Sequence, residues 1–118
     1  MGNPVVHFEL ASKDAERDKK FYSDLFGWQI ETRESPCYGV INTGDGGIGG
    51  GIFGIEDEQC CAPYVTIYVA VYCLKTALER VVELGCEVVV QPQSIPGGSF
   101  AMFLDPDKNL IGLWETAK

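Results

Sequence analysis

Several features that would narrow the function are scarce in this sequence of 118 residues. Histidine occurs once, and the five cysteines contain no C-x-x-C pair. Their odd number does not suit a complete disulfide framework, and their spacing does not suit a zinc finger. These two classes are therefore excluded, and the simplest interpretation is reduced cysteines in a cytoplasmic protein.

Basic residues are also few, with 9 Lys and Arg against 17 Asp and Glu and a formal net charge of −8. A surface of this sign repels phosphate backbones and anionic lipid, so no nucleic-acid or membrane partner is expected. The longest nearly apolar run, residues 62–74, is too short to span a bilayer. The N-terminal residues lack the basic and apolar stretches of a signal peptide, which again favours a cytoplasmic location.

Hydrophobic periodicity predicts the same order of elements in each half of the chain. The first half predicts a strand at 5–10, a helix at 14–26 and strands at 28–33, 38–42 and 44–54. The second half predicts a strand at 64–71, a helix at 74–84 and strands at 86–91, 99–104 and 110–114. Gly27 and Gly85 are placed where each helix should end.

Each predicted helix carries an apolar stripe. In the first helix the stripe is Phe21, Tyr22, Leu25 and Phe26, and the charged side chains, Lys19 among them, are expected on the opposite face. In the second helix the stripe runs from Leu74 through Leu78 to Leu84.

The repeated order predicts one α+β domain over residues 1–118, made of two βαβββ modules at 3–55 and 62–116. Each module has a sheet face that it cannot cover well. We therefore expect the two modules to form a curved eight-stranded sheet, with a central trough on one face and the helices on the outer face.

Three motifs carry a family resemblance: VVHFEL at 5–10, FYxxLFGW at 21–28 and FLDPDxN at 103–109. With the duplicated βαβββ plan, they are similar to the vicinal oxygen chelate superfamily, which includes glyoxalase I, bleomycin-resistance proteins, fosfomycin-resistance enzymes and extradiol dioxygenases. The resemblance covers essentially the whole chain and implies the fold. It leaves the function open, because the same fold hosts both enzymes and plain binding proteins.

In metal-using members, the resemblance implies a His or Glu ligand on the first and fourth strands of each module. Here these positions hold His7, then Gly50 or Gly51, then Thr66 and Gly112. Protein metal sites need at least three fixed donors, and Glu9 would add only a second one. No metal and no cofactor are therefore expected.

His7 and Glu9 lie two residues apart, on one face of the first predicted strand. His7 is either an inert, hydrogen-bonded strand residue or a catalytic acid–base group, and Glu9 has the same two interpretations. An adjacent carboxylate is expected to raise the pKa of His7.

The glycine-rich strand has no helix after its G-x-G-x-x-G match at 44–49, so a dinucleotide site is rejected. Its glycines instead leave room for a ligand to approach the backbone. About half of the aromatic candidates, which include Trp28, are expected in the core instead of the trough. The predicted ligand-binding residues are His7, Glu9, Gly50, Gly51, Phe53, Thr66, Tyr68, Met102 and Trp114.

The turn before the last strand contains Lys108, where the family pattern has glycine. A left-handed backbone there would cost a residue with a Cβ about 1 kcal/mol, unless Asn109 takes that conformation instead.

The sequence is compatible with three functions. The first is a metal-free protein that binds a small organic molecule in the trough, similar to bleomycin-resistance proteins. The second is a lyase or isomerase that uses His7 and Glu9 as catalytic acid–base groups on a small oxygenated substrate. A metal-dependent glyoxalase or dioxygenase is the least favoured. A homodimer is expected, because exposed sheet edges in a small chain gain from pairing.

Overall fold

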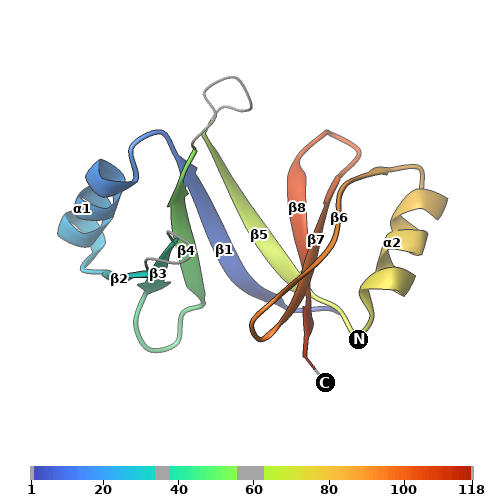
Figure 1. Cartoon of the computed structure of the whole chain (residues 1–118), viewed down its shortest axis with the longest axis horizontal. Helices are drawn as coiled ribbons and strands as arrows, with labels where there is room; N and C mark the ends of the chain where they lie inside the picture. The colour runs from blue at the N-terminus through green and yellow to red at the C-terminus, as the bar shows by residue number, and fades with distance from the viewer. Residues whose placement is uncertain (1, 34–37, 56–62, 118) are drawn as a thin grey trace. The chain divides into compact units, whose positions relative to one another are not determined.

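The structure is a computed structural model that describes residues 2–33, 38–55 and 63–117. Within it, eight strands and two helices follow the order βαβββ twice, as an α+β fold (Figure 1). The predicted fold class is therefore confirmed. Three of the five cysteines, Cys37, Cys60 and Cys61, lie outside the described residues. So do Ser35-Pro36, a dipeptide typical of a turn, and the acidic stretch at 56–58, typical of a linker.

The first module consists of β1 (Val5–Ser12), α1 (Ala15–Phe26), β2 (Gln29–Arg33), β3 (Tyr38–Asn42) and β4 (Gly49–Gly54). The second consists of β5 (Tyr64–Ala70), α2 (Leu74–Glu83), β6 (Glu87–Ile95), β7 (Gly98–Leu104) and β8 (Leu110–Thr116). The glycine-rich strand begins at Gly49, since the glycines before it form a turn.

In the first module the strand order is β2-β3-β4-β1. β1 runs parallel to β4, and β3 is antiparallel to both β2 and β4. Strand alternation places Leu10, Ile41 and Ile52 in a buried cluster on the α1 side, and Phe8 and Trp28 pack against it. Trp28 is thus one of the aromatic residues that belong to the core.

α1 begins at the N-cap Asp14, whose carboxylate accepts the backbone N–H of Arg17 at 3.1 Å. The predicted division of its faces is correct for Tyr22, which packs against the buried cluster, but not for four other residues. Lys19 is buried, whereas Phe21, Leu25 and Phe26 are each more than half exposed. Burial of Lys19 is tolerated because its ammonium donates to Glu16 and to Thr32, both at 2.9 Å, while its aliphatic stem packs against the sheet side.

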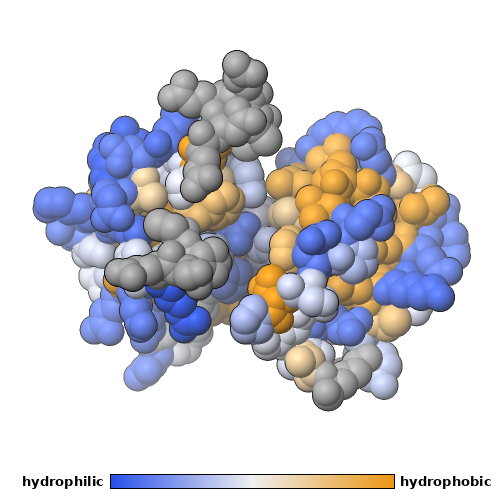
Figure 2. Space-filling model, in the orientation of Figure 1, coloured by the Kyte–Doolittle hydropathy of each residue, from blue (hydrophilic) through white to orange (hydrophobic). Residues whose placement is uncertain are grey.

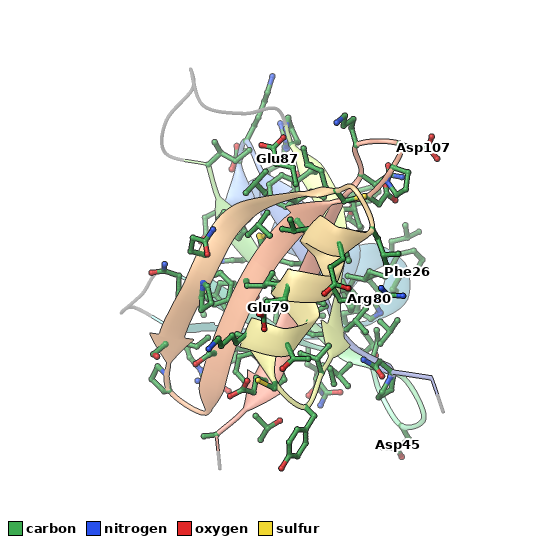
Figure 3. The ribbon with its side chains drawn as sticks, turned by 90° about the vertical axis from the view of Figure 1, so that its right-hand side faces the viewer. Phe26, Asp45, Glu79, Arg80, Glu87 and Asp107 are labelled. Carbon is green, nitrogen blue, oxygen red and sulfur yellow. The ribbon has the colours of Figure 1, made fainter. Side chains whose placement is uncertain are left out.

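In the second module the strand order is β5-β8-β7-β6, with β5 parallel to β8. Leu74 and Leu78 of α2 pack on Ala101 and Leu113 of the sheet, as the predicted stripe requires, although Leu84 at its end is exposed. Figure 3 shows α2 lying across β6 and β7, with Glu79 and Arg80 on its outer side. Each module thus places its helix on one face of its own strands.

Positive φ angles occur where the chain turns. Gly27 ends α1 at φ 72° and Gly85 follows α2 at φ 90°, as the sequence predicted. In the turn between β7 and β8, Lys108 itself takes the left-handed conformation at φ 69°, and Asn109 does not.

The chain divides into two compact units, residues 7–65 and residues 1–6 with 66–118. Neither α1 nor α2 has the length and apolar character that crossing a bilayer requires, among the residues described.

Candidate functional site

The candidate site lies on β1, on the side opposite the buried cluster. Because Phe8 and Leu10 point toward α1, alternation turns His7 and Glu9 to the other side. Both side chains are half-buried. We call this side the His7 face and define it by His7, Glu9, Tyr38, Gly51 and Phe53.

Tyr38, the first residue of β3, joins the two predicted catalytic residues. Its hydroxyl donates to Glu9 Oε2 at 3.0 Å, and the same oxygen lies 3.1 Å from His7 Nε2. His7 and Glu9 are thus linked through a phenol. Sequence reasoning missed Tyr38, because its place beside His7 and Glu9 depends on the pairing of β3 with the glycine-rich strand β4.

The two glycines of β4 that were predicted to face a ligand point in different directions. Gly51 pairs with Glu9 and belongs to the His7 face, and a Cβ built on it would overlap the Tyr38 hydroxyl. Gly50 pairs with Phe8, and a Cβ there would overlap the Phe8 ring on the α1 side. Gly51 therefore makes room for Tyr38, and Gly50 makes room for the core.

Aromatic rings continue the His7 face beyond Tyr38. Phe53 stacks on Tyr38, with ring centroids 6.3 Å apart and planes 16° apart. Tyr64 meets Phe53 edge-on, also at 6.3 Å. All three rings are half-buried, so this face combines apolar ring surface with the polar atoms of His7 and Glu9.

Burial lowers the pKa of His7 from its ordinary value of 6.5. The net direction is opposite to the one expected from Glu9 alone, because burial of the imidazole is the larger effect. A lowered pKa favours the neutral imidazole over the imidazolium.

The charged side chains nearest this face on the neighbouring strand are Glu31 and Arg33 of β2. Arg33 pairs with Tyr38, and Glu31 pairs with Val40, in antiparallel register. Both side chains are exposed to solvent, so they contribute only weakly to the electrostatic potential at the His7 face.

The other predicted ligand-binding residues lie in the second module. Thr66, Tyr68 and Met102 are each at least 93% buried, and the Thr66 hydroxyl donates to the carbonyl of Leu110. Tyr68 contacts Met102, with 4.0 Å from Oη to Sδ. Trp114 is half-buried, and its indole N–H donates to Thr116 at 3.1 Å. Their role in ligand binding stays a prediction.

The positions at which the family resemblance implies metal ligands do not fit a metal. In the first module the Tyr38 hydroxyl lies over Gly51, and in the second the Tyr68 ring lies over Gly112 in the same way. The Thr66 hydroxyl donates its hydrogen bond to a backbone carbonyl. In the described part of the chain, no three His, Cys, Asp or Glu side chains gather as a metal site requires.

A surface hollow of about 300 Å³ lies elsewhere, along α1, lined by Arg17, Asp18, Phe21 and Tyr22. It contains no group with a useful nucleophile or base, since Arg17 and Asp18 pair with each other at 3.0 Å. The candidate site is therefore placed on the His7 face and not in this hollow.

The fold and the site together define a class of proteins built from paired βαβββ modules. The chain belongs to the Glyoxalase/Bleomycin resistance protein/Dioxygenase superfamily, whose family model matches residues 5–113. The resemblance seen in the sequence motifs is thereby confirmed.

Known proteins similar to the chain differ in what they do. It is 27% identical, over 124 aligned positions, to the anthracycline biosynthesis protein DauV of Streptomyces sp. (strain C5); this covers 92% of the chain but only 45% of the relative. The chain thus spans less than half the length of that protein.

Among solved structures, methylmalonyl-CoA epimerase from Mycobacterium tuberculosis superposes with a TM-score of 0.70 at 16% identity, covering 97% of this chain and 88% of that one. A glyoxalase/bleomycin resistance protein/dioxygenase superfamily member from Vibrio splendidus 12B01 superposes with a TM-score of 0.70 at 19% identity. The match covers 97% of this chain and 99% of that one. At these identities the likeness shows the fold alone.

Proposed function

We propose that the chain binds a small organic molecule on the His7 face by shape and hydrogen bonds, without a metal. The observation that carries this proposal is the Tyr38 hydroxyl over Gly51, which places a phenol where the resemblance implies a metal ligand. The neighbouring rings of Phe53 and Tyr64 support it, because they offer apolar surface beside the polar atoms of His7 and Glu9.

The test is a binding screen of small oxygenated aromatic compounds against the protein, read by perturbation of the NMR signals of its single histidine. For a compound that binds, Phe53→Leu should weaken affinity about tenfold through lost ring contact. Phe21→Leu, at an exposed position on α1, is the matched control and should leave affinity unchanged. Stoichiometric metal in the purified protein that is lost in His7→Ala would overturn the proposal.

A second candidate function is a lyase or isomerase on a small oxygenated substrate, with His7 and Glu9 as catalytic acid–base groups. The specific observation in its favour is that both groups contact one phenol and that His7 has a lowered pKa, as a base at neutral pH needs. His7→Ala should then abolish turnover of an identified substrate. Unchanged turnover would eliminate this candidate.

We further propose a cytoplasmic homodimer. Apolar side chains exposed on the surface support association, among them Phe21, Leu25, Phe26, Val82 and Leu84, and Figure 2 shows hydrophobic surface over the second module. Sedimentation velocity at micromolar concentration should give twice the chain mass of 12.9 kDa. A monomer under these conditions would contradict the dimer and leave the ligand proposal untouched.

A further inference from the structure

We propose that two copies of this chain associate through the outer edge of β2, which pairs antiparallel with β2 of the partner subunit. This inference rests on the proposed homodimer and deepens it, because it names the surface and the register. The edge fits a second copy because the charges on β2 are complementary to themselves across a two-fold axis.

The edge of β2 is open to strand pairing. β2 ends the strand order of its module, and its five residues, Gln29–Arg33, are in unbroken antiparallel register with β3 on the inner side. Alternate residues of such a terminal strand direct their N–H and C=O groups outward, where another strand can bind them. Four of the five residues are exposed, so the edge is accessible to a partner.

The terminal strand of the second module, β6, is protected against this kind of pairing. It contains Pro92, which has no N–H to donate. Its register with β7 also shifts between Val88 and Val90, and again between Val90 and Gln93. Proline and bulges are devices by which edge strands avoid pairing with another chain. β2 carries neither over its described length, so strand pairing is favoured at β2.

A two-fold axis restricts the register of a β2 pair. Two residues that face each other in an antiparallel pair must both direct their backbone groups across the seam, or both direct them away from it. These directions alternate along the strand, so facing residues are an even number of positions apart in the sequence. Each allowed register is therefore centred on one residue that faces its own copy.

The charges on β2 select one of these registers. A register centred on Glu31 or on Arg33 places like charges directly opposite each other, which destabilises the pair. Registers centred on Gln29 or Ile30 bring no opposite charges together. The register centred on Thr32 places Glu31 opposite Arg33 of the partner subunit, and by symmetry it does so twice.

The strand is also ordered before it pairs. Ile30 packs against the buried cluster on the α1 side, and the Lys19 ammonium donates to the Thr32 hydroxyl at 2.9 Å. A strand that is already fixed loses less conformational entropy when it binds. Alternation turns Glu31 and Arg33 to the opposite side of β2, where both are exposed and able to reach across the seam.

Sedimentation equilibrium over a concentration series gives the dissociation constant of the dimer. Glu31→Arg creates two Arg–Arg pairs across the seam and should raise this constant at least about tenfold. Glu31→Arg/Arg33→Glu restores two opposite-charge pairs in the same register and should return the constant to within about threefold of the wild-type value. Glu79→Arg, on the outer side of α2 in Figure 3, makes the same change in net charge and should leave it unaltered.

Amide hydrogen exchange examines the same seam without any substitution. Alternate backbone amides of β2 should exchange more slowly at concentrations where the protein is dimeric than where it is monomeric. The amides of β6 should exchange equally at both concentrations. Slower exchange confined to β6 would contradict the choice of edge.

The inference is overturned if Glu31→Arg leaves the dissociation constant unchanged, or if Glu31→Arg/Arg33→Glu remains as weak as Glu31→Arg. A dimer that ignores both charge variants but dissociates in Leu25→Asp, at an exposed apolar position of α1, would refute the β2 seam and leave the homodimer standing. A monomeric wild type would refute the seam and the homodimer together and leave the ligand proposal untouched.

Discussion

Lys108 is a residue held in a backbone conformation that suits glycine. Its φ is 69°, and among the described residues it alone combines positive φ with a Cβ. The surrounding turn is kept by Asp105, whose carboxylate accepts the backbone N–H groups of Asp107 and Asn109, both at 2.9 Å. These bonds hold Lys108 in place at the expense of local strain.

Lys108→Gly should therefore stabilise the protein, by about 0.5–1 kcal/mol, because relief of the left-handed penalty exceeds the extra entropy of glycine in the unfolded chain. Urea unfolding of both proteins measures this difference. Lys75→Gly, within α2, should instead lower stability. A loss of stability in both variants would show that the turn is not strained.

His7 should make stability depend on pH. Its pKa is lowered in the folded state, by burial, below the ordinary 6.5. The unfolded chain therefore binds more protons between these two values, and the free energy of unfolding should fall as pH drops from 6.5 toward the folded pKa. Urea midpoints at pH 7.5 and 5.0 measure the effect.

His7→Gln serves as the control for this pH dependence, since glutamine has a polar side chain of similar reach but no titration in this range. The variant should lose part of the fall in stability between the two pH values. If the free energy of unfolding falls equally in both proteins, the pH dependence comes from the carboxylates of this acidic chain instead.

At the scale of elements, α2 shows a contact that no local pattern predicts. Its N-cap Cys73 makes no side-chain capping bond, but the Glu115 carboxylate on β8 accepts the backbone N–H of Leu74 at 2.6 Å. A carboxylate at a helix N-terminus satisfies an unpaired donor and complements the helix dipole. A strand residue thus caps a helix that begins 41 positions earlier.

Glu115→Ala should cost about 1–2 kcal/mol of unfolding free energy, since it removes this cap. Glu79→Ala, on the outer side of α2 in Figure 3, is the matched control and should change stability by less than about 0.5 kcal/mol. Thermal or urea unfolding compares them. Equal effects of the two substitutions would show that the cap contributes nothing specific.

Elements were predictable from sequence where one periodicity dominated. The bounds of β3 and the start of α2 agree with the prediction, because alternation and an apolar stripe are local signals. The orientation of α1 was not predictable, because burial of Lys19 depends on a hydrogen bond to Thr32, which lies on the strand β2.

His7 and Glu9 could be chosen as candidate site residues from the alternation of one strand. Tyr38 could not be chosen in this way, since only strand pairing brings it to them.

At the scale of the whole molecule, we propose that this chain binds no metal at the positions where the family resemblance implies one. Added Zn²⁺, Mn²⁺ or Ni²⁺ should therefore give no saturable rise in the melting temperature. A site occupied at a hundred times its dissociation constant would stabilise by about 2.7 kcal/mol, which differential scanning calorimetry resolves. A saturable rise that disappears in His7→Ala would contradict this expectation.

The tyrosine that lies over a fourth-strand glycine occurs twice, as Tyr38 over Gly51 and Tyr68 over Gly112. Either glycine changed alone to glutamate would meet a ring already in its place, and either ring removed alone would leave an unfilled gap. A single substitution at either glycine would therefore introduce a carboxylate only by displacing the tyrosine beside it.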